Sequence, residues 1–129
     1  MILVDSSVWI DYFNGRSTPQ SEKLDELLGV EDLAVGDLIL VEVLQGFRGK
    51  REFESARQLM FSLSVVDLCG AEIAVKAAEN YRFLRGGGFT VRKTIDCVIA
   101  TCCIERGYEL LHSDKDFEVF KRLHLKTVA

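Results

Sequence analysis

The sequence is poor in proline and histidine and has no long apolar segment. One proline, two histidines and ten glycines occur in 129 residues, which excludes collagen-like and low-complexity chains. A transmembrane helix needs roughly 18 consecutive apolar residues, whereas the longest apolar run, residues 97–104, has eight. The apolar N-terminal stretch ends at Val4 and is too short for the core of a signal peptide. We therefore expect a cytoplasmic protein without a membrane segment.

The cysteines do not form a metal-binding pattern. None of the four stands in a Cys-x-x-Cys pair, and with only two histidines a zinc site of ordinary spacing is not expected. Cys97, Cys102 and Cys103 fall within one apolar stretch. They are expected to be small buried side chains in a reducing compartment and not partners in disulfides.

Positive charge is not in excess. Sixteen basic and twenty acidic residues give a formal net charge of −4, whereas nucleic-acid-binding domains are usually basic. Binding to nucleic acid would therefore need a local basic patch or a bound metal. One segment could provide a local basic patch, because residues 82–93 carry four cations and no acid: Arg82, Arg85, Arg92 and Lys93.

Short apolar runs alternate with longer helical patterns along the chain. Hydrophobic residues make up 48% and charged residues 28%, as in ordinary globular proteins, and the length suits one domain, residues 1–129. The alternation predicts an α/β fold with a parallel sheet. Asp37 is the expected N-cap of its helix, and Asn14-Gly15 is the expected left-handed end of the first helix. Strands are expected at residues 2–4, 33–35, 63–68, 109–111 and 125–128, and helices at 7–13, 19–28, 37–45, 51–62, 71–85, 92–107 and 116–120.

Four acidic residues stand in apolar surroundings. They are Asp5 at the end of the first strand, Glu42 and Asp96 inside apolar helical segments, and Asp114 just past the fourth strand. The carboxyl ends of parallel strands lie at one edge of a sheet, where open α/β sheets carry their sites. Because carboxylates are almost never buried without a partner, we expect these four to share one pocket.

Each of these acids also has a purely structural interpretation. Asp5 and Asp114 could cap the helices that follow them. Glu42 could lie on a solvent-exposed stripe of its helix. Asp96 could pair with Arg92, four residues earlier on the same helix face.

Repulsion within a shared pocket would be large. Two unit charges about 4 Å apart repel by about 4 kcal/mol at an effective dielectric constant of about 20, so four carboxylates need protons or a cation. Ligands that are all oxygen suit a hard ion such as Mg²⁺ or Mn²⁺. An ion of this kind activates water and stabilises the charge of a phosphodiester under attack.

The same residues carry a family resemblance. Residues 2–9 (Ile-Leu-Val-Asp-Ser-Ser-Val-Trp) resemble the first motif of PIN-domain nucleases, and residues 42–46, 94–100 and 110–117 resemble the second, third and fourth. The four motifs occur in order, with the spacing of small PIN domains, over essentially the whole chain. Within that family the sequence is most similar to the VapC toxins of toxin–antitoxin pairs.

The resemblance implies a fold, an activity and a set of site residues. The fold would be a three-layer α/β/α sandwich around a parallel sheet of about five strands. The activity would be Mg²⁺- or Mn²⁺-dependent endoribonuclease cleavage, commonly of tRNA or rRNA. The implied site residues are the metal ligands Asp5 and Asp96, the further catalytic acids Glu42 and Asp114, and the supporting residues Ser7 and Asp116. Asp116 could instead be an exposed residue of a first helical turn, and Ser7 could be a residue that only starts a helix.

Binding partners follow from charge and from the resemblance. Contacts to RNA require positive charge, and the best candidates are the four cations of residues 82–93. They flank the glycines at 86–88, which suggest a mobile loop that adapts to RNA. Arg82 and Arg85 could instead serve only the C-terminal end of their helix. The resemblance adds a homodimer and a cognate antitoxin, which would lay an apolar or basic segment across the pocket.

Three alternatives stay open. A haloacid-dehalogenase-like phosphatase needs a second Asp two residues after the first, where this chain has Ser7. A phospho-receiver signalling module needs a phosphoacceptor after its third strand, and Asp67 is in roughly that place, but Asp5 has no acidic neighbour. A catalytically inactive PIN-like scaffold would be expected to lose some of the four acids, and all four are present.

Overall fold

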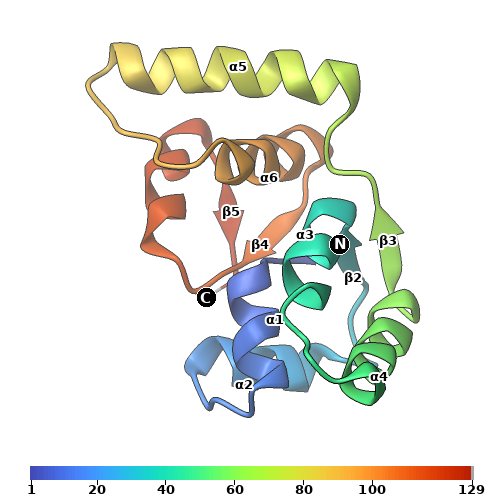
Figure 1. Ribbon diagram of the computed structural model, residues 1–129. Helices are drawn as coiled ribbons and strands as arrows, with labels where there is room; N and C mark the ends of the chain where they lie inside the picture. Colours follow the sequence, from blue (N-terminus) through green and yellow to red (C-terminus); the bar gives the residue numbers. More distant parts are fainter. Residues whose placement is uncertain (129) are drawn as a thin grey trace.

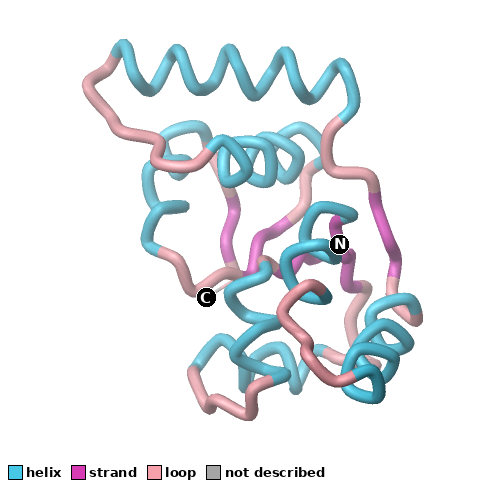
Figure 2. The backbone as a smooth tube through the Cα atoms, viewed as in Figure 1, coloured by secondary structure: helices cyan, strands magenta, loops and turns pink. Residues whose placement is uncertain are grey.

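The structure, a computed structural model, describes residues 1–128 (Figure 1; Figure 2). Its strands are β1 (Ile2–Val4), β2 (Leu33–Gly36), β3 (Ser64–Val66), β4 (Glu109–Leu111) and β5 (Lys126–Thr127). Its helices are α1 (Ser6–Phe13), α2 (Pro19–Leu27), α3 (Asp37–Leu44), α4 (Lys50–Phe61), α5 (Gly70–Gly86), α6 (Thr94–Arg106) and the 3₁₀ helix η1 (Lys115–Leu123). Strands and helices follow one another in the order that the sequence predicts.

The five strands are parallel and form one sheet in the order β3-β2-β1-β4-β5. β1 is central, with Leu3 opposite Ala34 of β2 and Leu110 of β4. The helices form two groups, because α1 contacts α2 and α3, α3 contacts α4, and α6 contacts both α5 and η1. Figure 1 shows α5 lying along the outer side of α6, away from the strands. The three-layer α/β/α sandwich expected from the sequence is confirmed.

The strand order separates this chain from phospho-receiver domains. Receivers share the flavodoxin-like order 2-1-3-4-5, whereas here β3 lies at the edge of the sheet beyond β2. Asp67 follows this edge strand and is exposed. The receiver alternative is therefore wrong.

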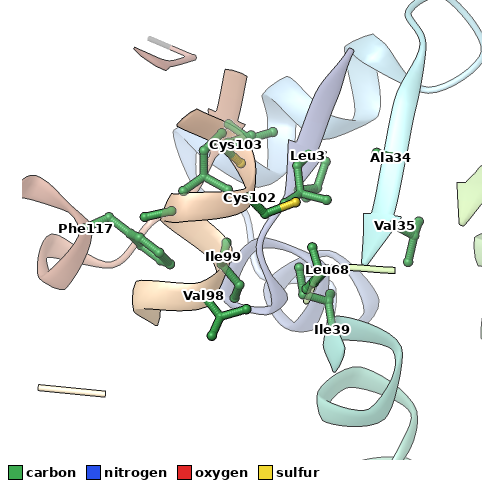
Figure 3. Packing of buried hydrophobic residues seen from close by; sticks show 14 of the residues in the cluster. Leu3, Ala34, Val35, Ile39, Leu68, Val98, Ile99, Cys102, Cys103 and Phe117 are labelled. Carbon is green, nitrogen blue, oxygen red and sulfur yellow. The ribbon is translucent and has the colours of Figure 1, made fainter. Parts of the chain in front are cut away.

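Hydrophobic residues are buried on both faces of the sheet, and one part of this core lies between α6 and the central strands. Residues 96–103 of α6 are all buried, which explains why this segment is apolar on every side. Figure 3 shows Ile99, Cys102 and Cys103 of α6 beside Leu3 of β1. The four cysteines are free thiols, and the three in α6 are buried, as the sequence predicts.

Helix ends follow local sequence signals, with one exception. Gly15 has a φ of +69° and ends α1 in the left-handed region, as expected. Asp37 is the exception, because it is the first residue of α3 and the preceding glycine is the N-cap. The Asp37 Oδ1 accepts hydrogen bonds from the N–H groups of Leu38 at 2.8 Å and Leu68 at 3.0 Å. The side chain therefore ties the end of β2 to the segment after β3 and accepts an N–H of the first turn from within the helix, not from the N-cap position.

The last helix differs from the expected one in length and type. A short helix is expected at residues 116–120, and the structure has a 3₁₀ helix over Lys115–Leu123. Phe117 and Phe120 are both buried, and their spacing of three residues matches the three-residue turn of a 3₁₀ helix. Within residues 1–128, no helix has both the length and the apolar character required of a membrane span.

Candidate active site

The site candidates lie at the point where the strand order reverses. This point is between β1 and β4, and ligands of open α/β sheets bind at the carboxyl ends of the strands there. Asp5 directly follows β1, and Asp114 lies shortly after β4. Asp96 stands in the first turn of α6. Three segments that are far apart in the sequence therefore bring acids to one edge of the sheet.

The carboxylates of Asp96, Asp114 and Asp116 form an acidic cluster. One oxygen from each lies within 4.8 Å of the other two. Asp96 is only 6% exposed, and its Oδ2 is buried without a hydrogen-bond partner among residues 1–128. Burial raises the pKa of Asp96 to about 6; the charge of Lys93 opposes this shift, and the charges of Asp5, Asp114 and Asp116 add to it. A buried anion without a partner is costly, so this position favours a proton or a bound cation.

Asp5, which follows β1, and Glu42 in α3 are not among the three acids of the acidic cluster. Asp5 is 4% exposed, and its charge contributes to the raised pKa of both Asp96 and Glu42. Burial is the main cause of the raised pKa of Glu42, while the Ser6 hydroxyl and Lys93 lower it. The Glu42 Oε1 is buried without a partner in the described part of the chain. Glu42 is therefore half-buried, with one carboxylate oxygen shielded from solvent.

Ser7 joins the ends of β1 and β4. Its Oγ donates to Asp5 Oδ2 at 2.6 Å and accepts from the Ser113 N–H at 3.3 Å. The Ser7 N–H also donates to Asp5 Oδ2, at 3.1 Å, and the Asp5 N–H donates to the Leu111 carbonyl at 2.9 Å. Asp5 thus caps α1, as its structural interpretation predicts, and is fixed from both strands.

The turn after β4 is held by side chains that accept hydrogen bonds from the backbone two residues further on. The His112 Nδ1 accepts from the Asp114 N–H at 3.2 Å, and the Asp114 Oδ1 accepts from the Asp116 N–H at 2.9 Å. Asp114 is therefore the N-cap of η1, which confirms its structural interpretation. The His112 ring packs against Phe117 with centroids 4.9 Å apart. Burial lowers the pKa of His112, which favours the neutral imidazole.

Arg92 and Lys93 lie against the acidic cluster as exposed counterions. The Arg92 Nε is 3.7 Å from Asp116 Oδ1, and the Lys93 Nζ is 3.9 Å from Asp114 Oδ2. The two basic side chains are 70% and 58% exposed. Ion pairs this exposed contribute little to stability, so both cations are free to exchange a carboxylate for another anion. The alternative in which Arg92 pairs with Asp96 is wrong, because Arg92 lies against Asp116.

The donor set suits a hard divalent ion. The acidic cluster offers carboxylate oxygens, which Mg²⁺ and Mn²⁺ prefer, and contains no cysteine or histidine. The Asp96 Oδ2 is buried without a partner among the described residues, and a bound cation would offset the cost of its burial. The acidic cluster can therefore hold a metal ion, while the identity of the individual ligands stays a prediction.

Comparison with known proteins gives the family. The chain matches the PIN domain over residues 2–123. It belongs to the PIN-domain family. Ribonuclease VapC11 of Mycobacterium tuberculosis is 32% identical over 125 residues, which span 95% of this chain and 93% of that protein.

Two solved structures show the same PIN-domain fold. A toxin–antitoxin complex from Klebsiella pneumoniae has a TM-score of 0.76 and 16% identity, covering 100% of this chain and 97% of that chain. VapC20 of Mycobacterium tuberculosis, a toxin that cleaves the sarcin-ricin loop, has a TM-score of 0.68 and 18% identity, covering 92% of this chain and 93% of that chain.

The basic segment of this PIN domain is divided between two places. Arg92 and Lys93 contact the acidic cluster. Arg82 and Arg85 instead border a cavity of about 500 Å³ between α5 and α6, where the Arg85 guanidinium lies 5.4 Å from the centroid of the Tyr81 ring. Of the four cations singled out in the sequence, two therefore stand at the acids and two along the neighbouring helix.

Two features of the PIN-domain site escape the sequence prediction. The hydrogen bond of His112 to the Asp114 backbone had a local signal in the sequence. Polar side chains that directly follow an apolar strand can accept hydrogen bonds from the backbone two residues further along the chain. The bond between Ser7 and Ser113 had none, since these residues are 106 positions apart and only the pairing of β1 with β4 brings them together. Asp116 has its place in the acidic cluster and is not an exposed residue of a first turn.

Proposed function

We propose that this PIN domain is an endoribonuclease that depends on a divalent metal and acts as the toxin of a toxin–antitoxin pair. The observation that carries the proposal is the buried, unpartnered oxygen of Asp96 within three convergent carboxylates at the strand-order reversal. VapC11, at 32% identity, is a ribonuclease, and VapC20 cleaves an RNA loop. RNA is accordingly the proposed substrate of this chain.

The proposed cofactor is Mg²⁺ or Mn²⁺. Asp5 and Asp96 are assigned as its principal ligands, and Glu42, Asp114 and Asp116 as the acids around them. When bound, such an ion supplies activated water and neutralises the charge that develops on the phosphodiester. Its binding also offsets the repulsion among these carboxylates, which is the reason that the protein tolerates them together.

The acids contribute in different ways. Asp5 is immobilised by Ser7 and by the cap of α1, so it presents its carboxylate in a fixed orientation. Partial burial raises the pKa of Glu42, so this acid holds a proton more tightly than an ordinary glutamate does. Perturbed acids in a cleft are typical of groups that take part in proton transfer. Glu42 is therefore assigned as the acid best suited to move a proton during cleavage.

Arg92 and Lys93 are the proposed contacts to RNA phosphates next to the cleaved bond. Both side chains already form long, exposed ion pairs with carboxylates, and an RNA phosphate can take the place of the carboxylate in each pair. We expect Arg92→Ala and Lys93→Ala each to reduce the slope of log affinity against log salt by about one. Arg82→Ala and Arg85→Ala are expected to have smaller effects on cleavage because their guanidinium groups lie along α5. Salt-dependent RNA binding, measured with a cleavage-deficient background, checks this, and unchanged slopes at Arg92 and Lys93 would contradict it.

The proposed protein partner is a cognate antitoxin. A similar structure is a toxin–antitoxin complex, and a basic segment of such a partner would be complementary to the acidic cluster. A homodimer and a cytoplasmic location belong to the same proposal, and the four free cysteines fit a reducing compartment. Co-expression with the adjacent reading frame, followed by size-exclusion chromatography with light scattering, measures both the complex and the oligomeric state.

The experiment that tests the nuclease proposal is cleavage of RNA with mapping of the new 5′ ends. Wild type is expected to cut in Mn²⁺ or Mg²⁺ and to stop when EDTA removes the metal. Asp96→Asn should be inactive, whereas Asp67→Asn should cut as wild type does. Asp67 is a matched control because it also follows a parallel strand but is exposed and lies outside the acidic cluster. Cleavage by Asp96→Asn would refute this site, and no cleavage by wild type would favour the inactive scaffold.

A further inference from the structure

We propose that His112 is a positioning residue of this site, whose Nδ1 fixes the turn that presents Ser113 and Asp114 to the acids of β1 and α6. The inference rests on the proposed metal-dependent nuclease. It assigns a function to a side chain outside the predicted set of site residues, and it concerns how the carboxylates are held and not which atoms bind the metal.

The first support is the direction of the hydrogen bond. The His112 Nδ1 lies 3.2 Å from the backbone nitrogen of Asp114. A backbone N–H can only donate, so Nδ1 must be the acceptor, and the ring proton of a neutral imidazole is then on Nε2. His112 thereby closes a side-chain turn over Ser113, of the kind that Asp and Asn side chains form with the N–H two residues on.

The second support is that the ring itself is fixed. Its centroid is 4.9 Å from that of Phe117, at an interplanar angle of 50°. Phe117 is fully buried and packs in turn near Phe120, with centroids 6.4 Å apart. Because the core of η1 sets the position of the ring, it also sets the position of Nδ1 and hence of the Asp114 backbone.

The third support is what this turn carries. The Ser113 N–H donates to Ser7 Oγ, which donates to Asp5, and the Asp114 carboxylate accepts from Asp116 N–H. The one turn therefore supplies Asp114 directly, orients the start of η1 where Asp116 stands, and is bonded through Ser7 to Asp5. Loss of the Nδ1 bond would let the turn relax and would affect three acids: Asp114 and Asp116 on the turn itself and Asp5 after β1.

Two substitutions separate hydrogen bonding from packing. His112→Phe keeps a ring against Phe117 and removes the acceptor. His112→Asn removes the ring and places Oδ1 near the position of Nδ1, in a turn that asparagine favours. A residue that only fills space would tolerate Phe better than Asn, whereas a residue that positions Asp114 would tolerate Asn better than Phe.

The experiment titrates the metal-free full chain with Mn²⁺ and follows free Mn²⁺ by electron paramagnetic resonance, with urea unfolding and RNA cleavage measured on the same samples. We expect His112→Phe to bind Mn²⁺ about tenfold more weakly than wild type, as is usual when a side chain that orients a ligand is lost. His112→Asn should stay within about threefold of wild type, although it loses more stability because it loses the ring. Cleavage should follow the Mn²⁺ affinity and not the stability.

The controls separate this inference from the proposed function. Asp96→Asn should bind no Mn²⁺, and if it binds as wild type does, or if wild type does not bind, the metal-site proposal itself fails. A second set of outcomes concerns His112 alone, and it requires that wild type binds Mn²⁺ and Asp96→Asn does not. The positioning role of His112 is then overturned if His112→Phe binds Mn²⁺ as tightly as wild type does. It is also overturned if His112→Asn binds Mn²⁺ as weakly as His112→Phe does. If His112→Phe does not fold, His112→Gln takes its place, because the glutamine acceptor is displaced by one bond. His112→Gln is then expected to bind Mn²⁺ more weakly than His112→Asn does.

Discussion

Asp5 and Asp114 each combine a structural and a chemical function in one side chain. A carboxylate oxygen of each residue caps a helix by accepting a hydrogen bond from a backbone N–H of its first turn. The helix is α1 for Asp5 and η1 for Asp114. The cap requires an acceptor, whereas the proposed metal site requires the negative charge. Asparagine keeps the acceptor and loses the charge, so folding and activity can be tested separately at these two residues.

We expect Asp5→Ala and Asp114→Ala each to lose about 1 kcal/mol of unfolding free energy, which is the usual cost of a lost N-cap. Asp5→Asn and Asp114→Asn should keep most of that stability. All four variants should lose metal-dependent cleavage. Urea denaturation in EDTA measures the first effect and the RNA cleavage assay the second; equal stability of the Ala and Asn variants would show that the caps contribute nothing.

Asp96 should make the metal-free protein less stable as the pH rises. Burial raises its pKa from 3.8 to about 6, so the folded state holds this proton more tightly than the unfolded chain does. The resulting stabilisation is complete below the unfolded pKa of 3.8 and is lost as the pH rises through about 6. Relative to Asp96→Asn, which does not titrate, wild type should be less stable by about 1–3 kcal/mol at pH 8 and by much less at pH 4. Urea denaturation in EDTA at both pH values checks this, and a pH-independent difference would contradict it.

The sequence identifies the acids of the site more readily than their partners. Asp5 and Asp96 stand out because each directly follows or interrupts apolar residues, and Asp114 because it comes shortly after an apolar strand. The pairing of Arg92 with Asp96 follows a helical spacing rule, but α6 begins only at Thr94, so Arg92 is not on the helix. Its side chain is free to reach Asp116, and such placements depend on how segments meet in space.

At the scale of elements, β2 ends in a glycine because Leu68 fills the space that a side chain would need. A Cβ on Gly36 would lie 2.5 Å from Leu68 Cδ1, and Leu68 is fully buried. We expect Gly36→Ala to lower the free energy of unfolding by about 1–3 kcal/mol through overpacking. Gly86→Ala in α5 is the matched control, because nothing lies within 4 Å of that position, and it should be neutral or slightly stabilising. Chemical denaturation of both variants provides the measurement.

The packing of α5 on α6 includes a buried polar contact. The Asn80 Nδ2 donates to Thr101 Oγ1 at 3.0 Å, and Thr101 is fully buried. We expect Asn80→Ala to cost about 1–3 kcal/mol, because the threonine hydroxyl loses its partner. Thr101→Val should cost less when Asn80→Ala is already present than when it is alone. A double-mutant cycle by urea denaturation measures this coupling, and strictly additive losses would show that the contact does not stabilise the pair of helices.

The alternation of apolar runs and helical patterns predicts the elements well because the three central strands are mostly buried and every helix has at least eight residues. Details at the ends are less predictable. Asp37 resembles an N-cap by composition, yet its carboxylate bonds Leu68 across the sheet. The glycine run predicts that α5 ends before Gly86, but the helix includes that residue. The first difference comes from a contact with a distant segment and the second from the backbone freedom of glycine. Neighbouring residues in the sequence determine neither.

At the scale of the whole molecule, the acids meet only in the folded chain, so metal binding should stabilise the fold. We expect Mn²⁺ at a hundredfold excess over its Kd to stabilise wild type by about 2.7 kcal/mol, which corresponds to a rise in Tm of about 5–10 °C for a domain of this size. Asp67→Asn should show the same rise and Asp96→Asn almost none. Thermal unfolding followed by fluorescence measures all three, and an equal rise in Asp96→Asn would mean that Mn²⁺ binds elsewhere.

The pairing of β1 with β4, where Ile2 lies opposite Glu109, joins the first strand of the chain to one of its last. A ribosome that has translated everything before β4 has already made Asp5, Glu42 and Asp96, but not the strand and turn that complete their surroundings. Unfinished or prematurely terminated chains should therefore be harmless to cellular RNA. Under the proposed function, this topology delays nuclease activity until β4 and the turn after it have been made, which gives a neutralising protein time to be present first.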